Sequence, residues 1–265
     1  MDASLKNADR FSGFADLYEN ARPKMPLFVI EIVKKYLGRR PDFVVDLGCG
    51  TGLSTVIWKN HCRHVVGIEP NDDMFAIAEQ KADAAVSFQK AYAHETGLNA
   101  ACADAIICSQ SFHWMHPDRT LSEVNRTLKP GGIFATVDCD WPPVFNWQVE
   151  KAYSDLRSTV KAIEREHPDF KNTAVRWDKN QHLTRIIASG YFRYCREIVF
   201  ASTEDCDAER LIAIALSQSG IQRIHTNAPD LIADAWNQFT VRARSLLGYN
   251  PLAVDFCYRM RIGIK

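Results

Sequence analysis

A glycine-rich segment that follows a short apolar run constrains this chain more than any other feature. The run Phe43–Leu47 has the length and composition of a buried strand, and residues 48–52 read Gly-Cys-Gly-Thr-Gly directly after it. Glycine allows positive φ and lets a ligand approach the main chain closely. The helix expected next presents its first N–H groups to an anionic part of that ligand. The segment therefore predicts a strand, a tight turn and a helix that together bind a small molecule.

An acidic residue at the end of the next predicted strand narrows the choice of ligand. Glu69 follows the strand at residues 64–68, 23 residues after Asp46, and this spacing suits a carboxylate that accepts hydrogen bonds from two ribose hydroxyls. A plain strand-to-helix turn explains the glycines but not the acid. A dinucleotide site requires Gly or Ala at the third position of G-x-G-x-x-G, where this chain has Leu53, and no Gly-Lys-Ser/Thr sequence indicates a P-loop.

The pattern of apolar residues predicts the fold class. Short buried strands, expected at residues 43–47, 64–68, 85–88, 105–109 and 133–137, alternate with amphipathic helices, which is typical of a parallel sheet covered by helices on both faces. Two later strands are expected at 191–200 and 254–262, and the last alternates cleanly, as an antiparallel strand would. We predict an α/β fold with a doubly wound, Rossmann-like, seven-stranded and mostly parallel sheet, an antiparallel last strand and a helical cap. In that cap a helix is expected to stop near Gly220 and a long helix to begin at Pro229.

Composition excludes several classes of protein. The 265 residues include 32 Lys+Arg and 32 Asp+Glu, so the chain lacks the positive charge that nucleic-acid binding needs. No apolar run approaches the roughly 20 residues that cross a bilayer, and Met1 to Arg10 contain no apolar secretory segment. None of the eight cysteines forms a C-x-x-C pair or a zinc-finger pattern, so we expect no metal and a reducing, cytoplasmic location.

Five segments taken together resemble the motifs of class I S-adenosylmethionine-dependent methyltransferases. They are Asp46–Gly52 as the first motif, Ile68-Glu69-Pro70-Asn71 with Met74 as the second, Ala93–Leu98 as the adenine loop, Asp104–Gln110 as the fourth strand, and Leu128–Gly132 as the turn before the fifth. The resemblance covers roughly residues 11–140 and is specific for the cofactor but not for the substrate. It implies one domain with lid helices at 1–38, a cofactor-binding core at 39–140, and cap helices with the last two strands at 141–265.

Two further segments are similar to the small-molecule branch of trans-aconitate methyltransferase type. One is Phe14-Ala15-Asp16 with Tyr18, Arg22 and Pro23, and the other is Ser109–Trp114 after the fourth strand. In one respect the chain departs from the pattern, because Tyr92 stands where many relatives have an acid before the adenine-loop alanine. Adenine recognition is then expected to use the backbone at Ala93 and the side chain of His94.

The resemblance assigns roles to individual residues of the cofactor site. The glycines shape the loop around the methionine part of the cofactor, Asp46 organises that loop or contacts the amino group, Glu69 holds the ribose, and Met74 covers the adenine. Tyr18 and Arg22 close over the site, although a core position for Tyr18 and a solvated one for Arg22 are equally consistent with the sequence. The cofactor-binding set is Tyr18, Arg22, Asp46, Gly48, Cys49, Gly50, Thr51, Gly52, Glu69, Pro70, Met74, Ala93, His94, Ser109 and Gln110.

The acceptor site is expected beside the carboxyl ends of the strands. Its residues are Phe14, Tyr18, His113, Trp114 and Trp141, and the tryptophans indicate a partly apolar acceptor. Methyl transfer is an in-line displacement at a sulfonium methyl, so positioning and desolvation supply much of the acceleration. A carboxylate acceptor needs no base, whereas a hydroxyl or amine would use one, and His113 is the candidate base. The alternative is that His113, flanked by Phe112 and Trp114, only packs.

These inferences predict a methyltransferase that transfers the methyl group of S-adenosylmethionine to a small molecule, at a carboxylate or hydroxyl oxygen. The expected partner is that acceptor, with neither nucleic acid nor membrane, and the oligomeric state is left open. Two alternatives remain. A nucleic-acid or protein methyltransferase would be expected to show an Asn-Pro-Pro-Tyr motif or a basic stripe, and we find neither. A module that binds the cofactor without catalysis has the same cofactor motifs.

Overall fold

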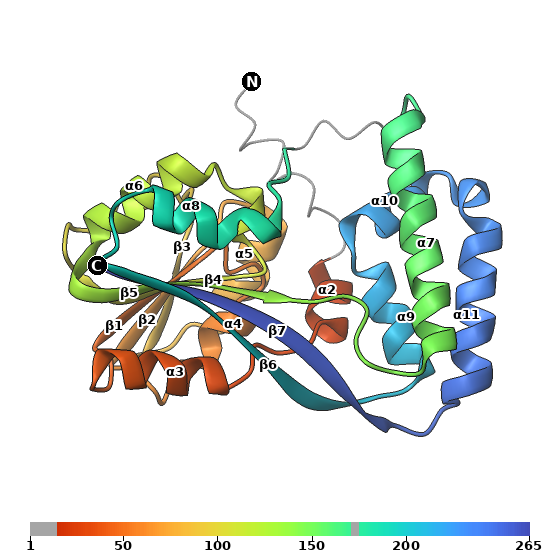
Figure 1. Cartoon of the computed structure of the whole chain (residues 1–265), viewed down its shortest axis with the longest axis horizontal. Coiled ribbons are helices and arrows are strands. Elements are labelled where there is room, and N and C mark those ends of the chain that lie inside the picture. The colour runs from red at the N-terminus through yellow and green to blue at the C-terminus, as the bar shows by residue number, and fades with distance from the viewer. Residues whose placement is uncertain (1–14, 171–174) are drawn as a thin grey trace.

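A seven-stranded sheet forms the centre of the computed structural model, which describes residues 15–170 and 175–265 (Figure 1). The strands are β1 (Phe43–Leu47), β2 (His64–Ile68), β3 (Val86–Gln89), β4 (Ala103–Ser109), β5 (Leu128–Cys139), β6 (Tyr194–Cys206) and β7 (Leu252–Ile264), in the order β3-β2-β1-β4-β5-β7-β6. All pairs among β1 to β5 are parallel, and β7 is antiparallel to both β5 and β6. The predicted fold class, with its mostly parallel sheet, is confirmed.

Burial explains why the strands differ in sequence. β1, β2 and β4 lie inside the sheet, are buried along almost their whole length and are mostly apolar. β6 is an edge strand, and its residues alternate between exposed and half-buried positions. The turn predicted at residues 129–132 lies within the bounds of β5. Pairing with β4 is interrupted there, because the paired residues of β5 are Leu128 and then Ile133.

Helices surround this sheet, and a second group stands beside it. The first group is α3 (Phe28–Leu37), α4 (Leu53–Val56), α5 (Asp72–Glu79), α6 (Pro117–Thr127) and α8 (His182–Ala188). The second is α7 (Trp147–Glu166), α9 (Ala208–Leu216), α10 (Ser219–Asn227) and α11 (Ala233–Leu247), with α2 (Ala15–Ala21) between it and the sheet (Figure 1). Short 3₁₀ turns are η1 (Phe112–Trp114), η2 (Lys179–Gln181) and η3 (Pro229–Leu231). Among the described residues, no helix combines the length and apolar composition needed to cross a membrane.

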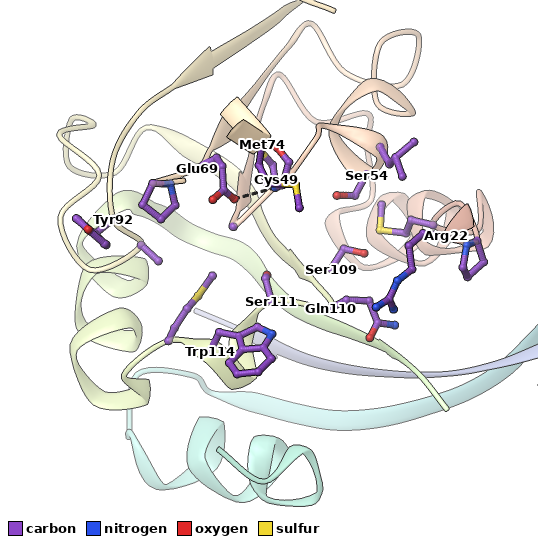
Figure 2. Close-up of a pocket in the computed structure, with 18 of the residues that line it drawn as sticks. Arg22, Cys49, Ser54, Glu69, Met74, Tyr92, Ser109, Gln110, Ser111 and Trp114 are labelled. Carbon is purple, nitrogen blue, oxygen red and sulfur yellow. Dashed lines mark hydrogen bonds between the residues drawn. The ribbon is translucent and has the colours of Figure 1, made fainter. Parts of the chain in front are cut away.

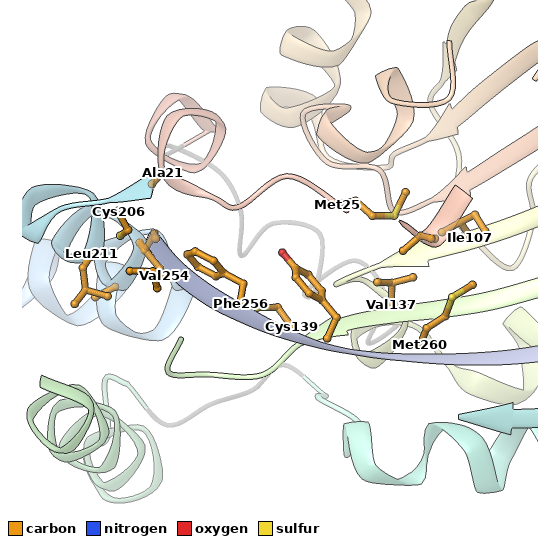
Figure 3. Close-up of a cluster of buried hydrophobic side chains, with 14 of the residues drawn as sticks. Ala21, Met25, Ile107, Val137, Cys139, Cys206, Leu211, Val254, Phe256 and Met260 are labelled. Carbon is orange, nitrogen blue, oxygen red and sulfur yellow. The ribbon is translucent and has the colours of Figure 1, made fainter. Parts of the chain in front are cut away.

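One hydrophobic core runs from the sheet into the helical cap. Figure 3 shows Val137 and Met260 on the sheet side, Leu211 and Val254 on the cap side, and Phe256 between them. Phe256 is fully buried and lies on β7, the long strand that extends from the sheet to the cap helices. The cap is therefore held against the sheet by shared apolar packing, which fixes the walls of any site between them.

The cap helices differ from expectation at two places. Gly220 does not end a helix but lies in α10, a helix that was not predicted. A Cβ on Gly220 would lie 3.2 Å from Val160 Cγ1 on α7. The glycine thus allows two helices to approach closely rather than stopping one. The long helix expected from Pro229 is divided, because Ile232 leaves the helical region at φ −121° between η3 and α11.

Candidate functional site

A cavity opens beyond the carboxyl ends of β1, β2 and β4, where the strand order reverses between β1 and β4 (Figure 2). Ligands bind at this position in open α/β sheets. Figure 2 shows Glu69 and Met74 on one wall, Trp114 and Gln110 on the opposite wall, and Tyr92 and Arg22 at the two ends. The predicted cofactor residues that line it are Arg22, Gly48, Cys49, Gly50, Glu69, Pro70, Met74, Ala93, His94, Ser109 and Gln110. Of the predicted acceptor residues, Trp114 and Trp141 line the same cavity.

Gly48 and Gly50 of the glycine loop line the floor of this cavity on either side of Cys49. Gly48, Gly50 and Gly52 have φ of 65°, 57° and 86°, which other residues rarely adopt. A Cβ on Gly48 would lie 2.7 Å from Met115 Cε, whereas a Cβ on Gly50 would meet no protein atom within 4 Å. Because Gly50 lines the cavity, its missing side chain leaves that space to a ligand.

Asp46 precedes the glycine loop, hydrogen-bonds to the helix that follows it, and does not line the cavity. Its side chain is fully buried, and Oδ2 accepts hydrogen bonds from the hydroxyls of Ser54 and Thr55, both at 2.7 Å. Burial raises the pKa of Asp46 to about 6, although these two bonds act in the opposite direction. Asp46 thus binds the start of α4, the helix that follows the glycine loop, and its two predicted roles stay predictions. Thr51 is also buried and does not line the cavity, and neither does Gly52.

Glu69 lies at the end of β2 with its carboxylate against the loop. Oε2 accepts a hydrogen bond from the N–H of Gly50 at 2.8 Å, and Oε1 accepts one from the N–H of Asn71 at 2.9 Å. Burial raises the pKa of Glu69 to about 7 despite these bonds. Each carboxylate oxygen can accept more than one hydrogen bond, so both retain capacity for hydroxyl groups in the cavity.

Apolar and aromatic side chains form the end of the cavity beyond Glu69. Asn71 accepts a hydrogen bond from the N–H of Met74 at 3.0 Å and so caps α5, which fixes Met74 at the wall. The rings of Tyr92 and His94 are 5.6 Å apart on the adjacent loop. This end can enclose a flat heterocycle between a thioether and the loop.

Arg22 and Gln110 mark the opposite end, where the cavity reaches the cap. Arg22 donates a hydrogen bond to the carbonyl of Ser217 at 3.1 Å, and its guanidinium lies 5.4 Å from the ring centre of Trp141. Gln110 directly follows β4 with φ of 56°, a strained value for a residue other than glycine. Phe14 lies outside the described residues, and so does the side chain of Tyr18.

A second cavity adjoins the first at Arg22, Gln110, Trp114 and Trp141, which line both. Five cationic side chains line it, namely Arg22, Arg157, Lys161, Arg176 and Lys179, against the single acid Glu164. Of these five cations, only Arg22 was predicted from the sequence. A signal was present for Arg157 and Lys161, which lie four residues apart beside the apolar stripe of α7 and so share one face.

Lys179 links this second cavity to the sheet. Its ammonium lies 2.9 Å from Oδ1 of Asp138 on β5 and donates to Oε1 of Gln110 at 2.8 Å. The other oxygen of Asp138 accepts from Arg261 on β7 at 2.9 Å. The Gln110 amide is therefore held in one orientation at the junction of the two cavities.

His113 lines the second cavity but not the first. It is buried, its Nδ1 lies 3.8 Å from Oδ1 of Asp138, and burial holds its pKa well below the usual range. Within the described residues, His113, Asp138 and His182 form a cluster with the spacing of metal ligands. However, Lys179 and Arg261 already occupy the two oxygens of Asp138, and their positive charges disfavour a divalent cation there.

Comparison with known proteins adds independent information. Residues 45–136 match the family model described as a methyltransferase domain. A probable S-adenosylmethionine-dependent methyltransferase of Saccharomyces cerevisiae is 32% identical over 125 residues, which is 44% of this chain and 43% of that protein. An uncharacterized methyltransferase of Mycobacterium tuberculosis is 32% identical over 127 residues, 48% of this chain and 51% of that protein. The matched stretch thus spans about half the length of these relatives.

The fold also matches that of solved structures. A putative type II methyltransferase from Anaeromyxobacter dehalogenans superposes with a TM-score of 0.64 at 20% sequence identity, covering 92% of this chain and 97% of that one. At this identity the likeness concerns the fold, and it extends over the cap as well as the sheet.

Proposed function

Residues 45–136 form a class I S-adenosylmethionine-dependent methyltransferase domain, and from this premise we propose that the protein transfers the methyl group to an oxygen of a small anionic molecule, with a carboxylate favoured over a hydroxyl. S-adenosylmethionine supplies a methyl group on a sulfonium, whose neutral thioether is the leaving group. The residues of this chain bind and orient the reactants and exclude water from them.

The first cavity fits this cofactor. The open space at Gly50 accommodates its methionine part, the Glu69 carboxylate faces the ribose hydroxyls, and Met74, Ala93 and His94 enclose the adenine. Arg22 lies at the cap end of the same cavity, where it can bind a carboxylate. These roles follow from the chemistry of the lining residues and from the resemblance of their motifs.

The charge of the second cavity is the observation that carries the acceptor class. Five cations and one acid line it. Even with Lys179 paired to Asp138 and Arg22 assigned to the cofactor, three cations remain against Glu164, so an anion is attracted there and an ammonium is repelled. A carboxylate that approaches a sulfonium also neutralises its charge in the transition state, which a water-poor site favours. The aromatic rings of Trp114 and Trp141 at the junction keep water from the point of transfer.

Proton transfer and hydrogen bonding favour the same acceptor. A carboxylate needs no general base, and the lowered pKa of His113 makes that buried histidine a weak one. Because Lys179 donates to Oε1 of Gln110, the Nε2 group of that amide is the end that can donate to an acceptor oxygen. We therefore propose that His113 belongs to the wall of the acceptor cavity and is not the base.

A reducing, cytoplasmic environment is part of this proposal. All eight cysteines are free thiols in the structure, and five of them are buried. Free, buried cysteine is typical of proteins that function where disulfides do not form.

The test is methyl transfer with radiolabelled cofactor. Purified protein is incubated with mono-, di- and tricarboxylates, alcohols, amines and total RNA, and base-labile label distinguishes esters from N-methyl groups. We expect label in carboxylates, lost in the Gly50→Val variant. Label in amines or RNA would contradict the acceptor class, and binding without turnover across the panel would favour a non-catalytic module.

A further inference from the structure

A single lysine joins the glycine loop to the N-terminal helix. Lys81 lies just beyond the end of α5, and its ammonium donates a hydrogen bond to the carbonyl of Thr51 at 2.7 Å. The same ammonium lies 2.6 Å from Oε1 of Glu19 on α2. Both side chains are about three-quarters buried, with exposed fractions of 25% and 24%. Three segments that are distant in sequence therefore meet at one ammonium.

The hydrogen bond to Thr51 fixes the peptide plane that joins Thr51 to Gly52, where the loop enters α4. The Thr51 carbonyl belongs to the same peptide as the N–H of Gly52, which donates to the carbonyl of Cys49 at 3.0 Å. This plane is thus held on both sides, next to Gly52, whose backbone has no side chain to restrict it. Since glycine loses more conformational freedom on ordering than other residues, a charged hydrogen bond here stabilises the loop where it is most needed.

Helix α2 connects this point to the far end of the cofactor cavity. Arg22 directly follows α2, lines both cavities and donates to the carbonyl of Ser217 in the cap. Glu19 and Arg22 are less than one helical turn apart in sequence. The ion pair with Lys81 therefore holds the helix from which Arg22 extends.

We propose that Lys81 is a positioning residue for cofactor binding, which holds the glycine loop in its binding shape through the Thr51 carbonyl, while Glu19 keeps the ammonium in place. The inference rests on the proposed function in one respect, namely that the glycine loop binds the cofactor. An isolated ion pair near the surface contributes little by itself, so the role assigned to Lys81 depends on the carbonyl it contacts.

Variants at both ends of the ion pair separate the two contacts of Lys81. Lys81→Met removes both, Lys81→Arg retains a charged donor, and Glu19→Gln removes the charge of the helix partner only. The exchange E19K/K81E restores opposite charges but places at position 81 a carboxylate, which cannot donate to the carbonyl. Lys90→Met is the matched control, because Lys90 pairs with the exposed Asp72 of α5, away from the loop.

The affinity for S-adenosylhomocysteine is measured by calorimetry, and the thermal midpoint is measured without ligand. Loss of a charged hydrogen bond should weaken binding roughly tenfold or more in K81M and in E19K/K81E, with a smaller loss in E19Q and wild-type affinity in K81R and K90M. A purely structural role would lower the midpoint and leave the affinity intact. Lys81→Ala, which also lacks a donor, replaces K81M if that variant does not fold.

Two results would overturn the proposal for Lys81 alone: affinity within twofold of wild type in K81M, or recovery of affinity in E19K/K81E. Failure of the wild-type protein itself to bind S-adenosylhomocysteine would instead overturn the cofactor assignment, and the role of Lys81 with it.

Discussion

The Oε2 atom of Glu69 accepts a hydrogen bond from the main-chain N–H of Gly50 at 2.8 Å, which joins the end of β2 to the middle of the glycine loop. Two elements that were predicted separately from the sequence, an acid and a glycine turn, are thus parts of one structure. The carboxylate holds the loop and lines the cavity at the same time. Its chemistry should therefore affect both stability and ligand binding.

Removal of this carboxylate should weaken cofactor binding. We expect Glu69→Ala to lower the affinity for S-adenosylhomocysteine by roughly 1.5–3 kcal/mol, the range for hydrogen bonds that involve a charged group. Calorimetry measures the loss, and Asp72→Asn, an exposed change at the start of neighbouring α5, is the control. A loss below a few tenths of a kcal/mol would show that Glu69 does not hold the ribose.

The raised pKa of Glu69 predicts how stability depends on pH. Its pKa is about 7 in the folded protein, above the usual value of 4.5, so the folded state binds the proton more tightly than the unfolded state. The contribution of Glu69 to stability is then fully present below about pH 4.5 and is lost as the pH rises through about 7. Urea unfolding from pH 5 to 8 should show the wild type losing stability relative to Glu69→Gln, by up to about 3 kcal/mol. Parallel pH profiles of the two proteins would contradict the raised pKa.

Two glycines with similar backbones allow a test of the loop. Gly50 and Gly38 have φ of 57° and 70°, and a Cβ on either would meet no atom within 4 Å. Gly50 lines the cofactor cavity, whereas Gly38 ends α3. Gly50→Val and Gly38→Val should therefore cost similar stability through backbone strain, but only Gly50→Val should abolish binding of S-adenosylhomocysteine. Equal affinities in the two variants would place the cofactor elsewhere.

Much of the lining of the first cavity could be predicted because its signals are local. The glycine loop and Glu69 each follow a buried strand, and parallel strands bring their carboxyl ends to one edge of the sheet. The hydrogen bonds of Asp46 to Ser54 and Thr55 could not be predicted from the sequence pattern, and its two predicted roles stay predictions. The order of β6 and β7 likewise depends on pairing between distant segments.

Most cations of the second cavity could not be predicted because tertiary packing brings them together. Arg157 and Lys161 lie on a cap helix, and Lys179 lies in a 3₁₀ turn. In sequence, such cations are indistinguishable from those of a solvated helix face. Only the close approach of α10 to α7 at Gly220 and the shared core along β7 bring this face against the sheet.

The charge of the second cavity predicts a separation between acceptor and cofactor binding. Lys161 lines that cavity from α7, whereas Lys151, about three turns away on the same helix, is exposed and pairs with Asp155. Lys161→Met should lower kcat/KM for the carboxylate identified in the acceptor panel by roughly tenfold or more, since a charged contact to the anion is lost. It should leave the affinity for S-adenosylhomocysteine unchanged, and Lys151→Met should alter neither quantity. High salt screens long-range attraction between surface charges but not a direct contact. The difference in kcat/KM between the two variants should therefore persist at high salt. Equal losses in both variants would mean that the overall charge of the cap, and not a contact in the cavity, attracts the acceptor.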